Sequence, residues 1–236
     1  MAAWRVALQL SGVNFRAPLF GGRARSGPDA PPPHDLASRL RGRDWRLYLP
    51  LVPVLAWFTW HHTRDAGYRG IYQGLNLALH EGGHLFLMWF GIDLLTVAGG
   101  TLFEVGIPLL VALYFWRQGD AVGSLVATFW AGTALLSVAP YMADARVQVL
   151  PLVTVGDGPV GHDWFLLLEA VGLLGQDEAL ARMVRGVGLA LLWACTAALV
   201  WLLREMREVN RRPADGGRGI DETAADRMDR PPFDRC

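Results

Sequence analysis

The residues best suited to chemistry in this sequence are His80-Glu81-Gly82-Gly83-His84, a His-Glu-x-x-His pattern. Helix residues four apart lie on one face, one turn apart, so His80 and His84 are placed to hold one metal ion. The spacing is typical of zinc, which lowers the pKa of a bound water toward 7. Glu81, about 100° around the helix, is then placed to act as general base. With six His and seven Glu in 236 residues, chance produces the pattern roughly 0.005 times.

The motif lies inside a run of 23 residues, Gly70 to Ile92, whose one formal charge is Glu81. A charge in the middle of a membrane helix costs at least ~2.5 kcal/mol, so such a residue is functional by default. Gln73 and Asn76 share the helix face of the two histidines and extend it into a polar stripe. Two other interpretations stay open: a polar stripe that joins helices by hydrogen bonds, and haem ligation by the histidines, which does not explain Glu81.

The element that must position the motif is one of several apolar helices. The chain is 52% hydrophobic and 19% charged, below the roughly 25% charged residues of soluble domains. Helices are expected because only they and closed barrels satisfy their backbone in lipid. We predict an all-α, polytopic transmembrane bundle of about six membrane segments from runs at 47–63, 70–92, 94–116, 121–143, 164–175 and 186–203. The short run at 164–175 is either the sixth span or a re-entrant piece.

Charge divides the chain into three parts. Residues 1–46 form a predicted flexible basic tail, 47–203 the transmembrane core, and 204–236 a charged tail predicted to be disordered. Arginines flank the first and last runs, so the positive-inside rule places both termini in the cytoplasm. We expect a multi-pass protein of a bacterial inner membrane. The net charge is zero, which gives no case for nucleic-acid binding. The oligomeric state is left open.

A catalytic zinc usually has three protein ligands, and the third must come from later in the chain. The candidates are His162, Asp144, Asp163 and Asp157. Glu104, the other charge within an apolar run, could line the same cavity or lie near enough to the surface to extend its carboxylate to water.

Each of these candidates also has a structural interpretation. Asp163 is suited to cap a helix N-terminus, and Asp157 precedes a glycine as turn residues do. Asp144 is suited to pair with Arg146, and His162 to a surface loop. An acid that is not a ligand can orient a histidine through its second nitrogen.

A membrane-embedded His80-Glu81-Gly82-Gly83-His84 resembles the site-2 protease family of intramembrane zinc metallopeptidases. The resemblance implies that His80 and His84 bind zinc, that Glu81 is the general base, and that the substrate is another membrane protein. The family takes its third ligand from an Asn-x-x-Pro-x-x-x-x-Asp-Gly motif. The nearest match here is Gln148-x-x-Pro151 followed by Asp157-Gly158, with Gln for Asn and one extra residue before the Asp.

We therefore predict a zinc metalloendopeptidase that acts within the lipid bilayer on membrane-associated proteins. One alternative is a membrane zinc hydrolase that cleaves a lipid amide or ester, because many chemistries share such a site. The other is a non-enzymatic metal-binding membrane protein.

Overall fold

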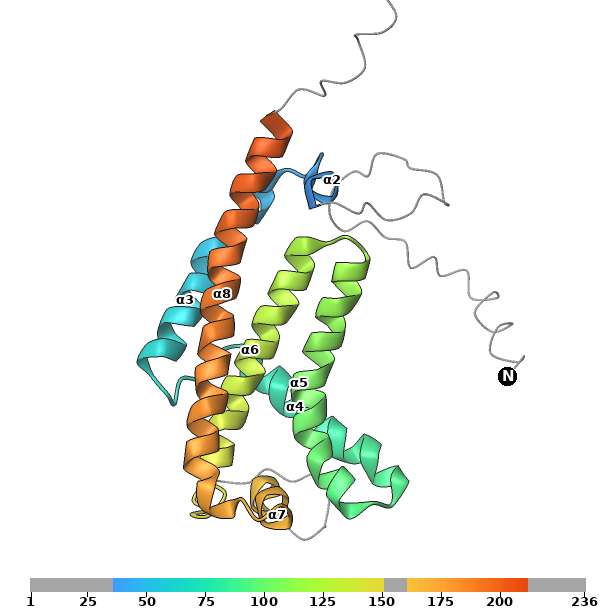
Figure 1. The fold of residues 1–236 in the computed structure, drawn as a ribbon, viewed down its shortest axis with the longest axis vertical. Coiled ribbons are helices and arrows are strands. Elements are labelled where there is room, and N and C mark those ends of the chain that lie inside the picture. The colour runs from blue at the N-terminus through green and yellow to red at the C-terminus, as the bar shows by residue number, and fades with distance from the viewer. Residues whose placement is uncertain (1–35, 151–160, 212–236) are drawn as a thin grey trace, which may run out of the picture.

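Every regular element in the described residues, 36–150 and 161–211, is a helix (Figure 1), as a computed structural model of the chain shows. The prediction of an all-α protein is confirmed for this part of the chain. The α-helices are α2 Leu36–Leu40, α3 Leu51–Arg64, α4 Tyr72–Leu87, α5 Asp93–Arg117, α6 Ala121–Ala143, α7 Asp163–Ala170 and α8 Asp177–Arg211. Three short 3₁₀ helices, η1 Trp45–Tyr48, η2 Met88–Phe90 and η3 Leu174–Gln176, lie between them.

Three stretches are long and apolar enough to cross a membrane: α5, α6 and the helical stretch Leu174–Arg211. Each of the six predicted runs overlaps a helix, but the prediction of six crossings is not confirmed. Helices α3, α4 and α7 have 14, 16 and 8 residues, fewer than the roughly 17–25 that a crossing needs. In the run at 70–92, α4 ends at Leu87 and is followed by η2, and the chain turns at Gly91, whose φ of 65° favours glycine.

Helical structure extends beyond both boundaries predicted for the core. The last helix continues past residue 203 to Arg211, α2 lies before residue 47, and η1 begins before it at Trp45. Helix α2 and the last turns of α8 pack together, because Leu40 and Met206 are buried in one apolar cluster. The Asn210 side chain also accepts a hydrogen bond from the Gly42 N–H and donates one to the Arg43 carbonyl. The remainder of the predicted tails, residues 1–35 and 212–236, lies outside the described part of the chain.

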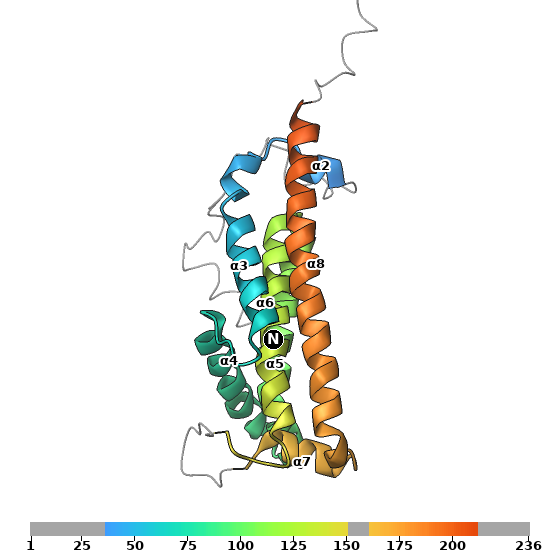
Figure 2. The same cartoon turned by 90° about the vertical axis from the view of Figure 1, so that its left-hand side faces the viewer.

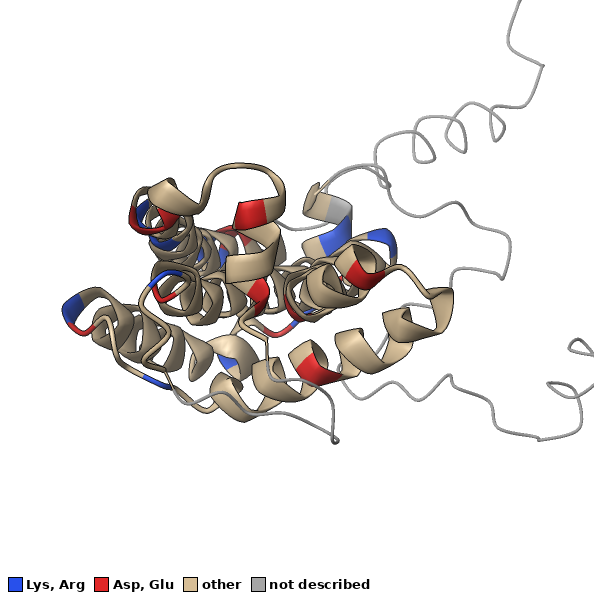
Figure 3. Cartoon of the chain, turned by 90° about the horizontal axis from the view of Figure 1, so that it is seen from below, with Lys and Arg blue, Asp and Glu red and all other residues tan. Residues whose placement is uncertain are grey.

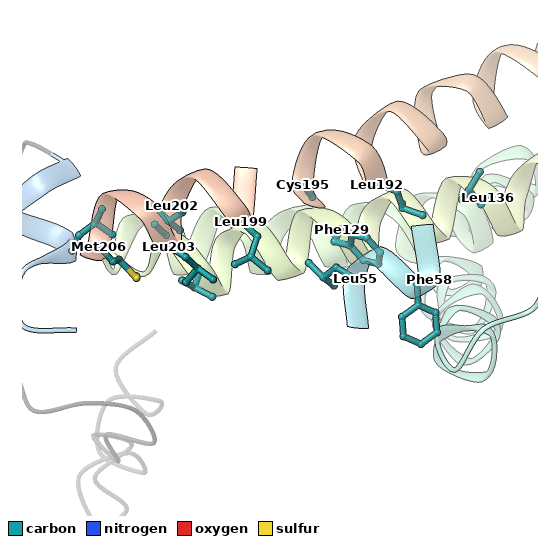
Figure 4. Close-up of a cluster of buried hydrophobic side chains, with 13 residues drawn as sticks. Leu55, Phe58, Phe129, Leu136, Leu192, Cys195, Leu199, Leu202, Leu203 and Met206 are labelled. Atoms are coloured by element: carbon teal, nitrogen blue, oxygen red, sulfur yellow. The ribbon is translucent and has the colours of Figure 1, made fainter. Parts of the chain in front are cut away.

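The main apolar core lies between α3, α6 and α8 (Figure 4). Leu55 and Phe58 of α3 meet Phe129 of α6 and Leu192 and Leu199 of α8 in this cluster. Turned by 90°, the view shows α3 beside α8 (Figure 2). Helix α6 also packs against α5 and α4, so this core supports the helix that carries the His-Glu-x-x-His motif.

Helix α4 runs antiparallel to the first half of α5, and the two backbones touch. Gly83 faces Gly99, and a Cβ on Gly83 would overlap the Gly99 carbonyl oxygen. Because two glycines meet here, α4 comes close enough to α5 for the polar side chains of the two helices to reach each other. Gly82, one residue earlier, has no atom within 4 Å of the position of a Cβ.

The neighbouring glycines of the motif therefore differ in what they tolerate. We expect Gly83→Ala to lower the thermal unfolding midpoint in detergent, because forced overpacking costs about 1–3 kcal/mol. Gly82→Ala is the matched control and should leave the midpoint unchanged or raise it, because alanine favours helix by about 1 kcal/mol. Equal loss of stability in the two variants would contradict the close approach of α4 and α5.

Candidate metal centre

Three side chains from two helices converge at one end of the bundle. The His80 Nε2 atom lies 2.9 Å from Asp163 Oδ2, and His84 Nε2 lies 3.1 Å from the same oxygen. The three ligand atoms that these residues offer all lie within 4.8 Å of one another. His80 and His84 come from successive turns of α4, and Asp163 is the first residue of α7. Of the candidates for a third ligand, the fold thus brings Asp163 to the two histidines.

This geometry fits a metal ion. Ligand atoms that surround a tetrahedral ion at ~2.0–2.2 Å lie about 3.3–3.6 Å from each other, close to the 2.9 and 3.1 Å found here. Two imidazoles and one carboxylate are a common ligand set for catalytic ions, which keep a further position for water or substrate. His80, His84 and Asp163 could therefore hold a divalent ion.

The second ring nitrogen of each histidine is also occupied. His84 Nδ1 lies 2.8 Å from the Thr96 carbonyl oxygen. Since a carbonyl oxygen only accepts, this nitrogen carries the proton and donates it, which leaves the Nε2 lone pair free for a metal. His80 Nδ1 lies 3.1 Å from Glu104 Oε2, which orients that ring in the same way.

Glu104 lies on α5 and is almost fully buried, with 3% of its surface exposed. From its position in an apolar run we predicted that it could line the cavity, and the structure places it against His80. The Thr96 carbonyl was not predicted. A backbone group has no sequence signature, and only the docking of α4 on α5 brings it to His84.

Gly100 leaves the space in front of both ligand nitrogens. A Cβ there would lie 2.6 Å from the Nε2 atoms of both His80 and His84. Nothing in the sequence assigned a role to Gly99 or Gly100. In the structure α5 continues through both glycines, and Gly100 provides the room that an ion needs.

Asp163 is held in place by its own backbone and by the residue before it. Its N–H donates to the Tyr141 hydroxyl oxygen at 3.1 Å. His162 occupies the N-cap of α7, where its Nδ1 accepts a hydrogen bond from the Phe165 N–H at 3.3 Å. The N-cap that the sequence suggested for Asp163 is thus taken by His162, which leaves the Asp163 carboxylate free to face the histidines.

The structure does not bring His162 or Asp144 into the metal-binding group. His162 Nε2 lies 3.6 Å from Asp144 Oδ2, and both Asp144 oxygens accept backbone N–H groups, from Val149 and Leu150. Burial lowers the pKa of the His162 imidazole below its usual value, which favours the neutral ring that accepts at the N-cap. Asp157 lies outside the described residues.

Glu81 follows His80 on α4 and is only half-buried. Among the residues that the structure describes, it has no hydrogen-bond or ion-pair partner. One turn before His80 on α4, Asn76 accepts a hydrogen bond from the Trp130 side chain at 2.8 Å. The polar stripe therefore faces the protein interior. Asn76 joins α4 to α6, and His80 and His84 belong to the metal-binding group.

Comparison of the chain with protein-family models, curated proteins and solved structures found no match.

The contact between Glu104 and His80 predicts an effect on metal affinity. Partners of a ligating histidine are typically worth 10–100-fold in affinity, so we expect Glu104→Gln to weaken metal binding by about that factor in a chelator competition titration. Glu169→Gln, at an exposed acid on α7, is the control and should bind as the unaltered protein does. Unchanged affinity in Glu104→Gln would contradict the orienting role.

Gly100 offers a second test that leaves every polar group intact. A methyl group in Gly100→Ala would occupy the space in front of the two Nε2 atoms, so we expect metal binding to be lost. Gly106→Ala, on the same helix with no atom near its Cβ position, should bind normally. The measurement is the metal content of the two purified variants, and equal content would contradict this placement of the ion.

Proposed function

We propose that this chain is an intramembrane zinc metallopeptidase that hydrolyses peptide bonds of membrane-associated proteins. The observation that carries the proposal is the convergence of His80 Nε2, His84 Nε2 and Asp163 Oδ2. Glu81 is the residue next to the first ligand. The all-helical fold with three helices able to cross a membrane supports the bilayer as the place of action.

A zinc ion held by the three residues would supply Lewis-acid chemistry, polarising a carbonyl and lowering the pKa of water. Glu81 takes the proton from the attacking water as the water oxygen bonds to the peptide carbon. The same carboxylic acid then gives the proton to the amide nitrogen as the carbon–nitrogen bond breaks. The products are a carboxylic acid and an amine, and Glu81 returns to its starting state. The remaining proton passes from the new acid to the amine, which leaves a carboxylate and an ammonium group.

The surroundings of Glu81 favour this role over simple packing. An acid in an apolar run that serves only structure needs a partner to offset its desolvation. Glu104 has such a partner in His80, whereas Glu81 has no hydrogen-bond or ion-pair partner within the described residues. A side chain that must exchange protons with water and a leaving group needs this freedom.

Metal content is the first test. Zinc measured by mass spectrometry in the purified protein should be close to one ion per chain, and His80→Ala should lose it. Near-zero zinc in both proteins would contradict the proposal.

The role of Glu81 separates the peptidase from its alternatives. Glu81→Gln should keep the metal and lose 10²–10⁴-fold in hydrolysis, the usual worth of a general base. Activity is measured with membrane-anchored peptides and, in parallel, with lipid amides and esters. Hydrolysis of the lipids alone would favour a lipid hydrolase. A phenotype in His80→Ala that is absent from Glu81→Gln would favour a non-enzymatic metal-binding protein.

A further inference from the structure

The two ends of the bundle carry different charge. The end at which α2 and the last turns of α8 lie holds eight arginines, which we call the arginine end: Arg39, Arg41, Arg43, Arg46, Arg117, Arg204, Arg207 and Arg211. The opposite end, at which α7 lies, has Arg146, Arg182 and Arg185. Arg64 and Arg69 lie at the junction of α3 and α4. Figure 3 views the α7 end and shows acidic residues on several of its helices.

Contacts between distant segments hold the arginine end together. The Arg43 guanidinium lies 2.7 Å from Asp120 at the start of α6, and the Arg207 guanidinium lies 5.6 Å from the ring centroid of Trp45. Both ends of the described chain are therefore at this end of the bundle (Figure 1). The sequence holds nine further arginines in the segments 1–35 and 212–236, which lie outside the described residues.

The metal-binding group belongs to the other end. Asp163 begins α7, Thr96 lies in the first turn of α5, and Tyr141 lies in the last turn of α6. Helix α3 follows α8 from the arginine end, as the Thr59–Thr196 hydrogen bond shows. Helix α4 then continues to the α7 end, so α3 and α4 together make one passage along the bundle (Figure 2). With α5, α6 and α8 this gives an even number of passages in the described chain.

We propose that the arginine end lies in the cytoplasm and that the metal centre faces the opposite membrane surface. Segments next to membrane helices that carry more arginine stay on the cytoplasmic side, and eight arginines stand against three here. This inference rests on the proposed function for its consequence, which concerns the substrate. The peptide bond to be cut belongs to a membrane-anchored polypeptide and lies in or beside the non-cytoplasmic leaflet.

The turn between α4 and α5 agrees with this placement. Residues 85–92 carry no charged side chain, and Trp89 is 87% exposed, with Phe86, Met88, Phe90 and Ile92 also exposed. Tryptophan is typical of the interfacial region of a bilayer, and apolar faces rich in Trp, Phe and Leu bury themselves at the boundary of its acyl chains. The turn continues the exposed apolar face of α5, on which Leu94 and Leu102 lie, so the metal centre is at the leaflet rather than in bulk water.

Cysteine labelling in spheroplasts tests the orientation in the full-length chain. The background is Cys236→Ser, because the other cysteine, Cys195, is buried. Glu178→Cys reports the metal-centre end and Arg41→Cys the arginine end, both at exposed positions. A membrane-impermeant maleimide should label Glu178→Cys in intact spheroplasts and Arg41→Cys only after permeabilisation, with both labelled equally once permeabilised.

The reverse pattern, or equal labelling of the two before permeabilisation, would overturn the inference. Arg182→Cys, one turn along α8 and also exposed, replaces Glu178→Cys if that variant fails to accumulate. Zinc content is measured on the same preparations. Reversed labelling with bound zinc would overturn the orientation alone, whereas absence of zinc from the unaltered protein would overturn the proposed function.

Discussion

The structure depends on one contact, in which the Asp163 carboxylate meets the ring nitrogens of His80 and His84 between apolar helices. A carboxylate removed from water is costly unless it is paired or bound to a metal. Helices α4, α5 and α7 each contribute to meeting that requirement. Helix α4 supplies two ring nitrogens on one face, and α7 supplies the carboxylate of its first residue. Helix α5 orients the two rings, because Thr96 and Glu104 contact their second nitrogens.

Small residues make this arrangement possible. The Gly83–Gly99 contact lets α4 approach α5 within reach of its carbonyl groups, and Gly100 leaves room in front of the ligand nitrogens. Glycines weaken helices, but here the packing of α5 against α4 and α6 compensates. The core between α3, α6 and α8 keeps α6 in place, and α6 in turn offers the Tyr141 hydroxyl to the backbone of Asp163.

Much of this could be predicted from the sequence, because helical periodicity and apolar runs are local properties. The positions of the helices, the pairing of His80 with His84 and the importance of Glu104 follow from spacing and charge. The choice among His162, Asp144 and Asp163 could not be made in that way. It depends on which of two adjacent residues caps α7, and the capping histidine turns away from the ligands while the aspartate turns toward them. The number of crossings also depends on non-local facts: the turn at Gly91 ends the η2 helix that follows α4, and α3 stops at Arg64.

The most direct test of the central claim is X-ray absorption spectroscopy of the purified, metal-loaded protein at the zinc edge. Coordination by two imidazole nitrogens and one carboxylate oxygen at ~2.0–2.2 Å is expected, with the oxygen contribution reduced and both imidazoles retained in Asp163→Ala. A spectrum that is identical in Asp163→Ala and the unaltered protein, or one that shows no imidazole ligands, would contradict the account.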